Sequence, residues 1–169
     1  EYLLIFTLDS ENQTIYYYTR MLQVTDDSAS ECLNFALKFH ENTFLPEGRS
    51  FFPTYMDEAT GDATTLNYVD LTCTVKQIMW ADFKGEILVE PIASFKEINS
   101  SYDVITLEYV ISNTNENGET EVYNVEEYFR LRLTETRMYV LNYERTMNQM
   151  FRGENNFLED TSKIQLGIR

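Results

Sequence analysis

The chain has 169 residues, of which 43% are hydrophobic and 24% charged, with only 6 glycines and 3 prolines. This composition excludes collagen-like and low-complexity chains, and the length predicts a single domain over residues 1–169. With 28 acidic and 13 basic residues the formal net charge is -15 at pH 7, so the surface repels nucleic-acid phosphates and anionic lipids. We therefore expect no nucleic-acid partner.

The N-terminal residues predict a β-hairpin. Residues 2–8 and 13–19 are rich in β-branched, aromatic and aliphatic side chains, and they flank the turn-forming residues 9–12. The opening apolar run, residues 2–6, is far shorter than the about 20 residues that span a bilayer, so we expect no membrane insertion of this segment. Because the chain starts at Glu1 without an initiator methionine, we interpret it as part of a larger protein.

A long helix is predicted over residues 28–43. Ser28 and Glu31 form a capping-box pattern at its start, and apolar side chains then recur at helical spacing up to His40. The helix should end before Pro46. A second, shorter helix is expected to start near Pro53 and stop before Gly61, since proline is tolerated in a first helical turn.

From residue 67 onward the apolar period changes to two. Val69, Leu71, Cys73 and Val75 alternate with polar residues, which predicts a half-buried strand. Residues 84–98 predict a pair of short strands interrupted by Pro91, which favours an edge or a bend.

Three longer alternating runs follow, around residues 105–111, 122–133 and 139–143, and they predict an antiparallel meander. A three-residue loop over 116–118 places Ile111 opposite Tyr123 and keeps the apolar faces together.

The same face-matching argument places Leu133 opposite Tyr139 and Leu131 opposite Leu141 in the last hairpin. The tail is expected to form a short helix or turn over residues 145–152 and a last edge strand over 163–168. The predicted fold is thus α+β: an N-terminal hairpin, then one long and one short helix on a curved antiparallel sheet ending in a three-stranded meander.

Cofactor and metal motifs are missing from the sequence. There is no Cys-x-x-Cys pair, no cluster of cysteine and histidine and no glycine-rich phosphate loop, so we expect neither zinc nor a nucleotide cofactor. Cys32 and Cys73 are read as free apolar side chains, although one disulfide between them stays an alternative. No residue is assigned a catalytic role.

Three residues form a candidate pocket: His40, Tyr109 and Glu127. His40 is the only histidine, and it is either a general base or a residue that closes the apolar helix face. Alternation points Glu127 toward the apolar side of its strand, where a carboxylate must be paired, protonated or in a water-filled cavity. Tyr109 lies on the matching apolar face of the preceding strand.

Two resemblances extend this interpretation. The segments Tyr123–Arg130 and Arg137–Arg145 resemble parts of large, uncharacterised membrane-anchored proteins of anaerobic Gram-positive bacteria, which implies a position just outside the membrane. Separately, helices followed by a long curved meander are similar to the cone-shaped fold of nuclear transport factor and ketosteroid isomerase relatives. That second similarity is architectural, and no isomerase site residue carries over.

The expected function is a non-enzymatic interaction or sensor domain at the cell surface, held by an anchor outside this chain. Its partners would be proteins, either other domains of the parent or a cell-surface protein. Tyrosine-rich strands such as Tyr16–Tyr18 are common in recognition faces, and Trp80 is either part of such a face or part of the core. The alternative is a small-molecule-binding or hydrolytic domain, with a cavity between the long helix and the sheet.

Overall fold

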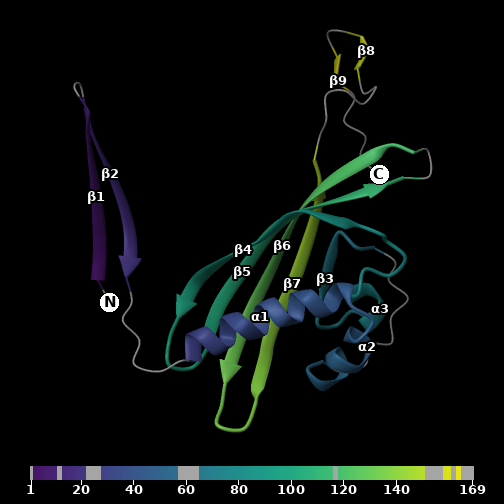
Figure 1. Ribbon diagram of the computed structural model, residues 1–169, viewed down its shortest axis with the longest axis horizontal. Coiled ribbons are helices and arrows are strands. Elements are labelled where there is room, and N and C mark those ends of the chain that lie inside the picture. The colour runs from purple at the N-terminus through teal and green to yellow at the C-terminus, as the bar shows by residue number, and fades with distance from the viewer. Residues whose placement is uncertain are drawn as a thin grey trace.

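The computed structural model (Figure 1) describes residues 2–10, 13–21, 28–56, 65–115, 118–150, 158–160 and 163–164. The helices are α1 (Ser28–Phe44), α2 (Gly48–Phe51), a 3-10 helix (Phe52–Thr54) and α3 (Val75–Ile78). The strands are β1 (Tyr2–Ser10), β2 (Gln13–Met21), β3 (Tyr68–Asp70), β4 (Glu86–Ile98), β5 (Asp103–Thr114), β6 (Thr120–Leu133), β7 (Met138–Gln149), β8 (Leu158–Asp160) and β9 (Lys163–Ile164).

The predicted α+β fold is confirmed. Five antiparallel strands form one sheet in the order β3-β7-β6-β5-β4, and α1 lies across one face of it (Figure 1). The β1–β2 hairpin forms a separate two-stranded sheet that stands apart from α1 and the larger sheet in Figure 1.

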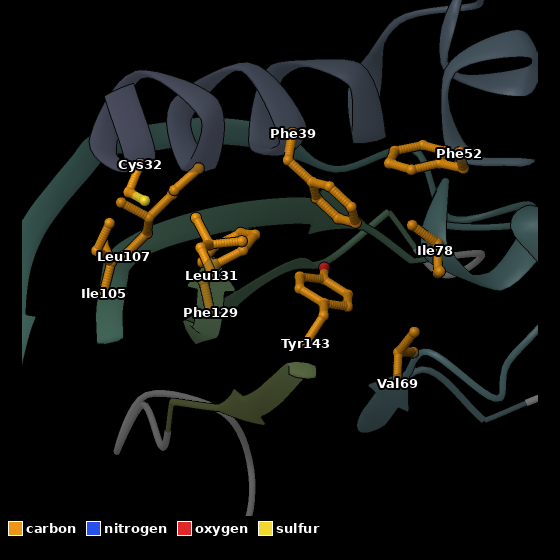
Figure 2. Close-up of a cluster of buried hydrophobic side chains, with 11 residues drawn as sticks. Cys32, Phe39, Phe52, Val69, Ile78, Ile105, Leu107, Phe129, Leu131 and Tyr143 are labelled. Atoms are coloured by element: carbon orange, nitrogen blue, oxygen red, sulfur yellow. The ribbon is translucent and has the colours of Figure 1, made fainter. Parts of the chain in front are cut away.

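The main core lies between α1 and the sheet. Alternate residues of β5 and β6, including Leu107 and Phe129, point toward the helix, and both side chains are fully buried. Figure 2 shows Phe39 of α1 pointing down onto this layer, with Phe52 and Tyr143 beside it. The helix buries side chains three or four positions apart, because that spacing puts them on one side: Ala29, Cys32, Ala36, Phe39, His40 and Thr43.

The strand predicted from residue 67 is wrong beyond Asp70. The Asp70 carboxylate accepts hydrogen bonds from the backbone N–H of Thr72 (2.8 Å) and from its hydroxyl (2.6 Å), which turns the chain. Thr74 and Gln77 then form a capping box that starts α3. A local hydrogen-bonding pattern therefore overrides the apolar alternation.

The predicted short helix is also misplaced. The chain becomes helical at Gly48, five residues before the predicted start, and Pro53 lies in the first turn of the 3-10 helix that follows α2. A Cβ atom at Gly48 would collide with the backbone carbonyl oxygen of Asn42, so a glycine lets this turn pack against the end of α1. Residues 57–60, which complete the predicted helix, lie in the segment 57–64 outside the described part of the chain.

Residues 86–98 form one strand, β4, where two short strands were predicted over 84–98. It lies at the edge of the sheet, as the Pro91 argument indicated, and pairs with β5 through three register shifts. These β-bulges absorb the break at Pro91 without ending the strand.

The predicted register is confirmed for the first hairpin and wrong for the second, where Leu133 pairs with Met138 and Tyr139 with Arg132. Ile111 lies opposite Tyr123 as predicted. A bulge after Arg130 then shifts the end of the β6–β7 pair, so that Leu131 pairs with Val140, and Leu141 is left 40% exposed.

The C-terminal predictions need correction as well. Residues 145–149 continue β7, whereas a helix or turn was predicted there. Lys163–Ile164 is strand as expected, and its partner is β8. Residues 151–157 and 165–169 lie outside the described residues.

Candidate functional site

The fold brings the three predicted pocket residues into direct contact. His40 comes from α1, Tyr109 from β5 and Glu127 from β6. The His40 Nδ1 atom lies 3.1 Å from Glu127 Oε2, and the Tyr109 hydroxyl donates to Glu127 Oε1 at 3.1 Å. All three side chains are buried, and Glu127 is fully enclosed. The inward position that alternation gives Glu127 is thus the observed one.

Two further residues belong to this group, and neither was predicted from the sequence. The Tyr143 hydroxyl donates to Glu127 Oε1 at 3.1 Å, and Arg145 lies opposite Glu127 on β7. Arg145 is fully buried, as is Tyr143. Alternation along 139–143 already pointed Tyr143 inward, and the same period would have placed Arg145 beside it if the strand had been extended. We call His40, Tyr109, Glu127, Tyr143 and Arg145 the buried polar cluster.

Arg145 is held in place by backbone oxygens and by an aromatic ring. Its two terminal nitrogens donate to the carbonyl oxygens of Ile78 (2.7 Å) and Gln77 (2.8 Å), at the end of α3. Its guanidinium carbon lies 3.6 Å from the centre of the Trp80 ring. Trp80 is therefore a core residue, and it does not form the aromatic contact surface considered above.

The two phenol hydroxyls of the cluster act as hydrogen-bond donors. Burial, and then the nearby Glu127 charge, raise the pKa of Tyr109 and Tyr143 well above its usual range, so both hydroxyls stay protonated and donate. Glu127 accepts these two bonds on Oε1, and its Oε2 lies 3.1 Å from His40 Nδ1, where an ionised carboxylate accepts the ring N–H. The other ring nitrogen, Nε2, is an acceptor in the neutral ring and a donor in the protonated ring.

Raising the pH above about 10 is expected to destabilise the fold through these phenols. A folded-state pKa above the unfolded value means that the stabilisation is complete below the unfolded pKa and is lost as the pH rises beyond it. Tyr143→Phe removes one such group, so its free energy of unfolding should fall less steeply above this pH. Urea denaturation at increasing pH measures this slope, and equal slopes for the two proteins would contradict the assignment.

A cleft lies next to the cluster, between α1 and β4. Its volume is about 530 Å³, within the range of small-molecule sites. The residues that line it are Leu37, His40, Glu41, Phe44, Leu45, Ile87, Glu90 and Pro91. His40 therefore belongs to both the cleft wall and the cluster, whereas the fully enclosed Glu127 reaches the cleft only through the His40 ring.

The β1–β2 hairpin presents a different surface. Antiparallel partners such as Phe6 and Tyr17 point to the same face. The register places seven large apolar or aromatic side chains on one face, which we call the apolar hairpin face: Tyr2, Leu4, Phe6, Leu8, Ile15, Tyr17 and Met21. Six of them are 39–57% exposed, and Ile15 is half-buried. The opposite face has fewer large apolar or aromatic side chains, Leu3, Ile5, Tyr16 and Tyr18, which are 50–64% exposed and lie among Thr7, Asp9 and Thr14.

Metal binding and thiol chemistry find no support in the described part of the chain. Within it, no group of three or more histidine, cysteine, aspartate or glutamate side chains is arranged to hold a metal ion. Both cysteines are free, and the Cys32 sulfur lies 3.9 Å from that of Met138. Burial raises the pKa of Cys32 to about 12, which leaves it protonated and unreactive.

Comparison with known proteins finds no relative of this chain. Among the helices that the structure describes, none is long and apolar enough to cross a membrane. No protein-family model, curated protein sequence or solved structure matches the chain, so its function has to be inferred from the side chains themselves.

Proposed function

We propose that the chain is a non-enzymatic protein-interaction domain that associates through its N-terminal hairpin. The observation that carries this proposal is the apolar hairpin face, whose side chains are about half exposed on a two-stranded sheet. A two-stranded hairpin is at best marginally stable in water, and contiguous apolar patches of this kind mark interaction sites. A partner that covers this face would stabilise the hairpin and gain hydrophobic free energy together.

The buried polar cluster supports binding over catalysis. Both Glu127 oxygens accept hydrogen bonds from side chains of the protein, and the Tyr109 and Tyr143 hydroxyls are used in the same contacts. A carboxylate engaged in this way holds helix α1 against β5, β6 and β7. The Glu127 side chain is fully enclosed, so a substrate in the cleft would not touch it directly.

The partner that we propose is a second copy of the same chain, packed face to face. At about half exposure, seven large side chains present roughly 700 Å², which is close to the about 800 Å² per partner of a standard interface. Identical faces related by a twofold axis are the commonest arrangement of soluble dimers.

Charge also favours the hairpin as the contact. Its two strands hold one acidic and one basic residue, Asp9 and Arg20, although the whole chain carries a formal charge of -15. Two copies that meet at this neutral element keep their acidic surfaces apart. Higher salt should strengthen the dimer, because it screens the remaining repulsion.

Two matched double variants test the proposal. Phe6→Lys with Tyr17→Lys changes a cross-strand pair on the apolar hairpin face, and Ile5→Lys with Tyr18→Lys changes the neighbouring pair on the opposite face. All four side chains are at least half exposed in the monomer, so neither variant should disturb the core. The first variant should weaken dimerisation about a hundredfold or more, because two large apolar contacts are lost, and the second should not.

Sedimentation equilibrium over a wide range of protein concentration measures the result. The wild type and the opposite-face variant should approach twice the monomer mass of 19.9 kDa, and the apolar-face variant should stay at that mass. A monomeric wild type at every concentration and salt level contradicts the proposal, as does equal weakening by both variants. The location outside the cytoplasm and the membrane-anchored parent stay predictions from the sequence.

A further inference from the structure

The cleft between α1 and β4 has features that the interaction proposal does not use. Its walls combine apolar side chains, such as Leu37, Phe44 and Ile87, with the carboxylates of Glu41 and Glu90. Both glutamates are exposed, and they come from opposite walls, one from α1 and one from β4. A ligand in the cleft would therefore meet a hydrophobic surface and negative charge together.

His40 gives the cleft a directed hydrogen-bond acceptor. Its side chain is only 4% exposed, it lines the cleft, and its Nδ1 atom is held by Glu127. No described residue forms a hydrogen bond with Nε2, yet Nε2 is not one of the buried polar atoms that lack a partner, so part of its surface is accessible. With Nδ1 held by Glu127, the Nε2 atom of the neutral ring meets the cleft as an acceptor whose orientation is already fixed.

These three properties specify one class of ligand. An acceptor nitrogen requires a donor, two carboxylates favour a positive charge, and the apolar walls favour a hydrocarbon or aromatic body. We infer that the cleft binds a small organic amine, whose ammonium group donates to His40 Nε2 between Glu41 and Glu90 while its apolar part packs against Phe44 and Ile87. This site is independent of the hairpin interface.

The chain carries its own reporters for this test. It contains one histidine and one tryptophan. The Phe44 ring, which lines the cleft, is stacked on Trp80 with ring centres 5.3 Å apart. Occupation of the cleft should therefore shift the imidazole signals of His40 in an NMR spectrum and change the fluorescence of Trp80.

Three probes that differ in one functional group separate charge from hydrophobicity: phenylbutylamine, phenylbutanol and phenylbutyrate. We expect the amine to bind about tenfold more tightly than the alcohol, and the acid to bind most weakly. The amine titration should also move the His40 signals. Equal affinities for the amine and the alcohol, or His40 signals that do not move, would overturn the inference.

A charge-matched pair of variants locates the preference. Glu41→Gln with Glu90→Gln should remove most of the difference between the amine and the alcohol, while leaving alcohol binding unchanged. The control, Glu97→Gln with Glu135→Gln, alters two exposed glutamates outside the cleft and should keep the difference. If both variants lose the preference equally, only general attraction to an acidic protein is at work and the site is rejected. The hairpin variants described above should bind the amine like the wild type, so the two proposals can fail separately.

Discussion

Glu127→Leu should lower the free energy of unfolding by about 3–5 kcal/mol, because removing one partner from a buried charge network leaves the others uncompensated. The wild-type carboxylate accepts from His40, Tyr109 and Tyr143. Leucine cannot accept, so three buried donors lose their partner and the enclosed guanidinium of Arg145 loses the opposite carboxylate. The whole free energy of unfolding of a small domain is only about 5–15 kcal/mol, so this loss is a large fraction of it. Urea unfolding followed by Trp80 fluorescence measures the change.

The neighbouring residue offers a strict control. Glu126 lies on the same strand, one position earlier, and its side chain is exposed on the opposite face of the sheet. Glu126→Leu should change the stability by no more than about 0.5 kcal/mol. Glu127→Gln, which keeps one acceptor oxygen, should fall between the two leucine variants. Similar losses from the changes at 126 and 127 would show that the cluster does not stabilise the fold.

Phe39→Ala is the second large effect, also with an expected loss of about 3–5 kcal/mol. The Phe39 ring is fully buried, and its centre lies 4.7 Å from that of Tyr143, 4.8 Å from Phe52 and 5.4 Å from Phe129. These neighbours come from β7, the 3-10 helix and β6, so they cannot all move into the space that an alanine leaves. Thermal and urea unfolding should both show the loss.

A phenylalanine at the sheet edge serves for comparison. Phe95 of β4 is 37% exposed, and its truncation leaves a groove that water can enter. Phe95→Ala should therefore cost about 1 kcal/mol, near the average for single substitutions. If Phe39→Ala costs no more than Phe95→Ala, the layer of α1 on the sheet does not dominate the stability.

The parts of the fold that were predicted correctly rest on long periodic patterns. The buried side of α1, the inward residues of β5 and β6 and the inward position of Glu127 all follow from periods of 3.6 or two that extend over many residues. The register of the β5–β6 hairpin was predicted correctly because only one of the two loop lengths keeps Ile111 opposite a residue of the apolar face.

The wrong predictions concern places where a local side-chain interaction or a bulge overrides the periodic apolar pattern. Between Asp70 and Gln77, a side-chain turn and a capping box replace a strand that the apolar pattern favoured. The bulge after Arg130 has no marker such as glycine, so face matching alone could not reveal it. Arg145 was missed because a buried arginine needs acceptors from a distant segment, here the carbonyl oxygens at the end of α3.

The irregular pairing of β4 limits how the protein can assemble. Pro91 has no N–H to offer to another strand, and the register shifts on either side of it distort the outer row of donors and acceptors. Copies of the five-stranded sheet therefore cannot join edge to edge into an open-ended fibre along this side. The proposed association through the apolar hairpin face, if it follows a twofold axis, would instead stop at two copies.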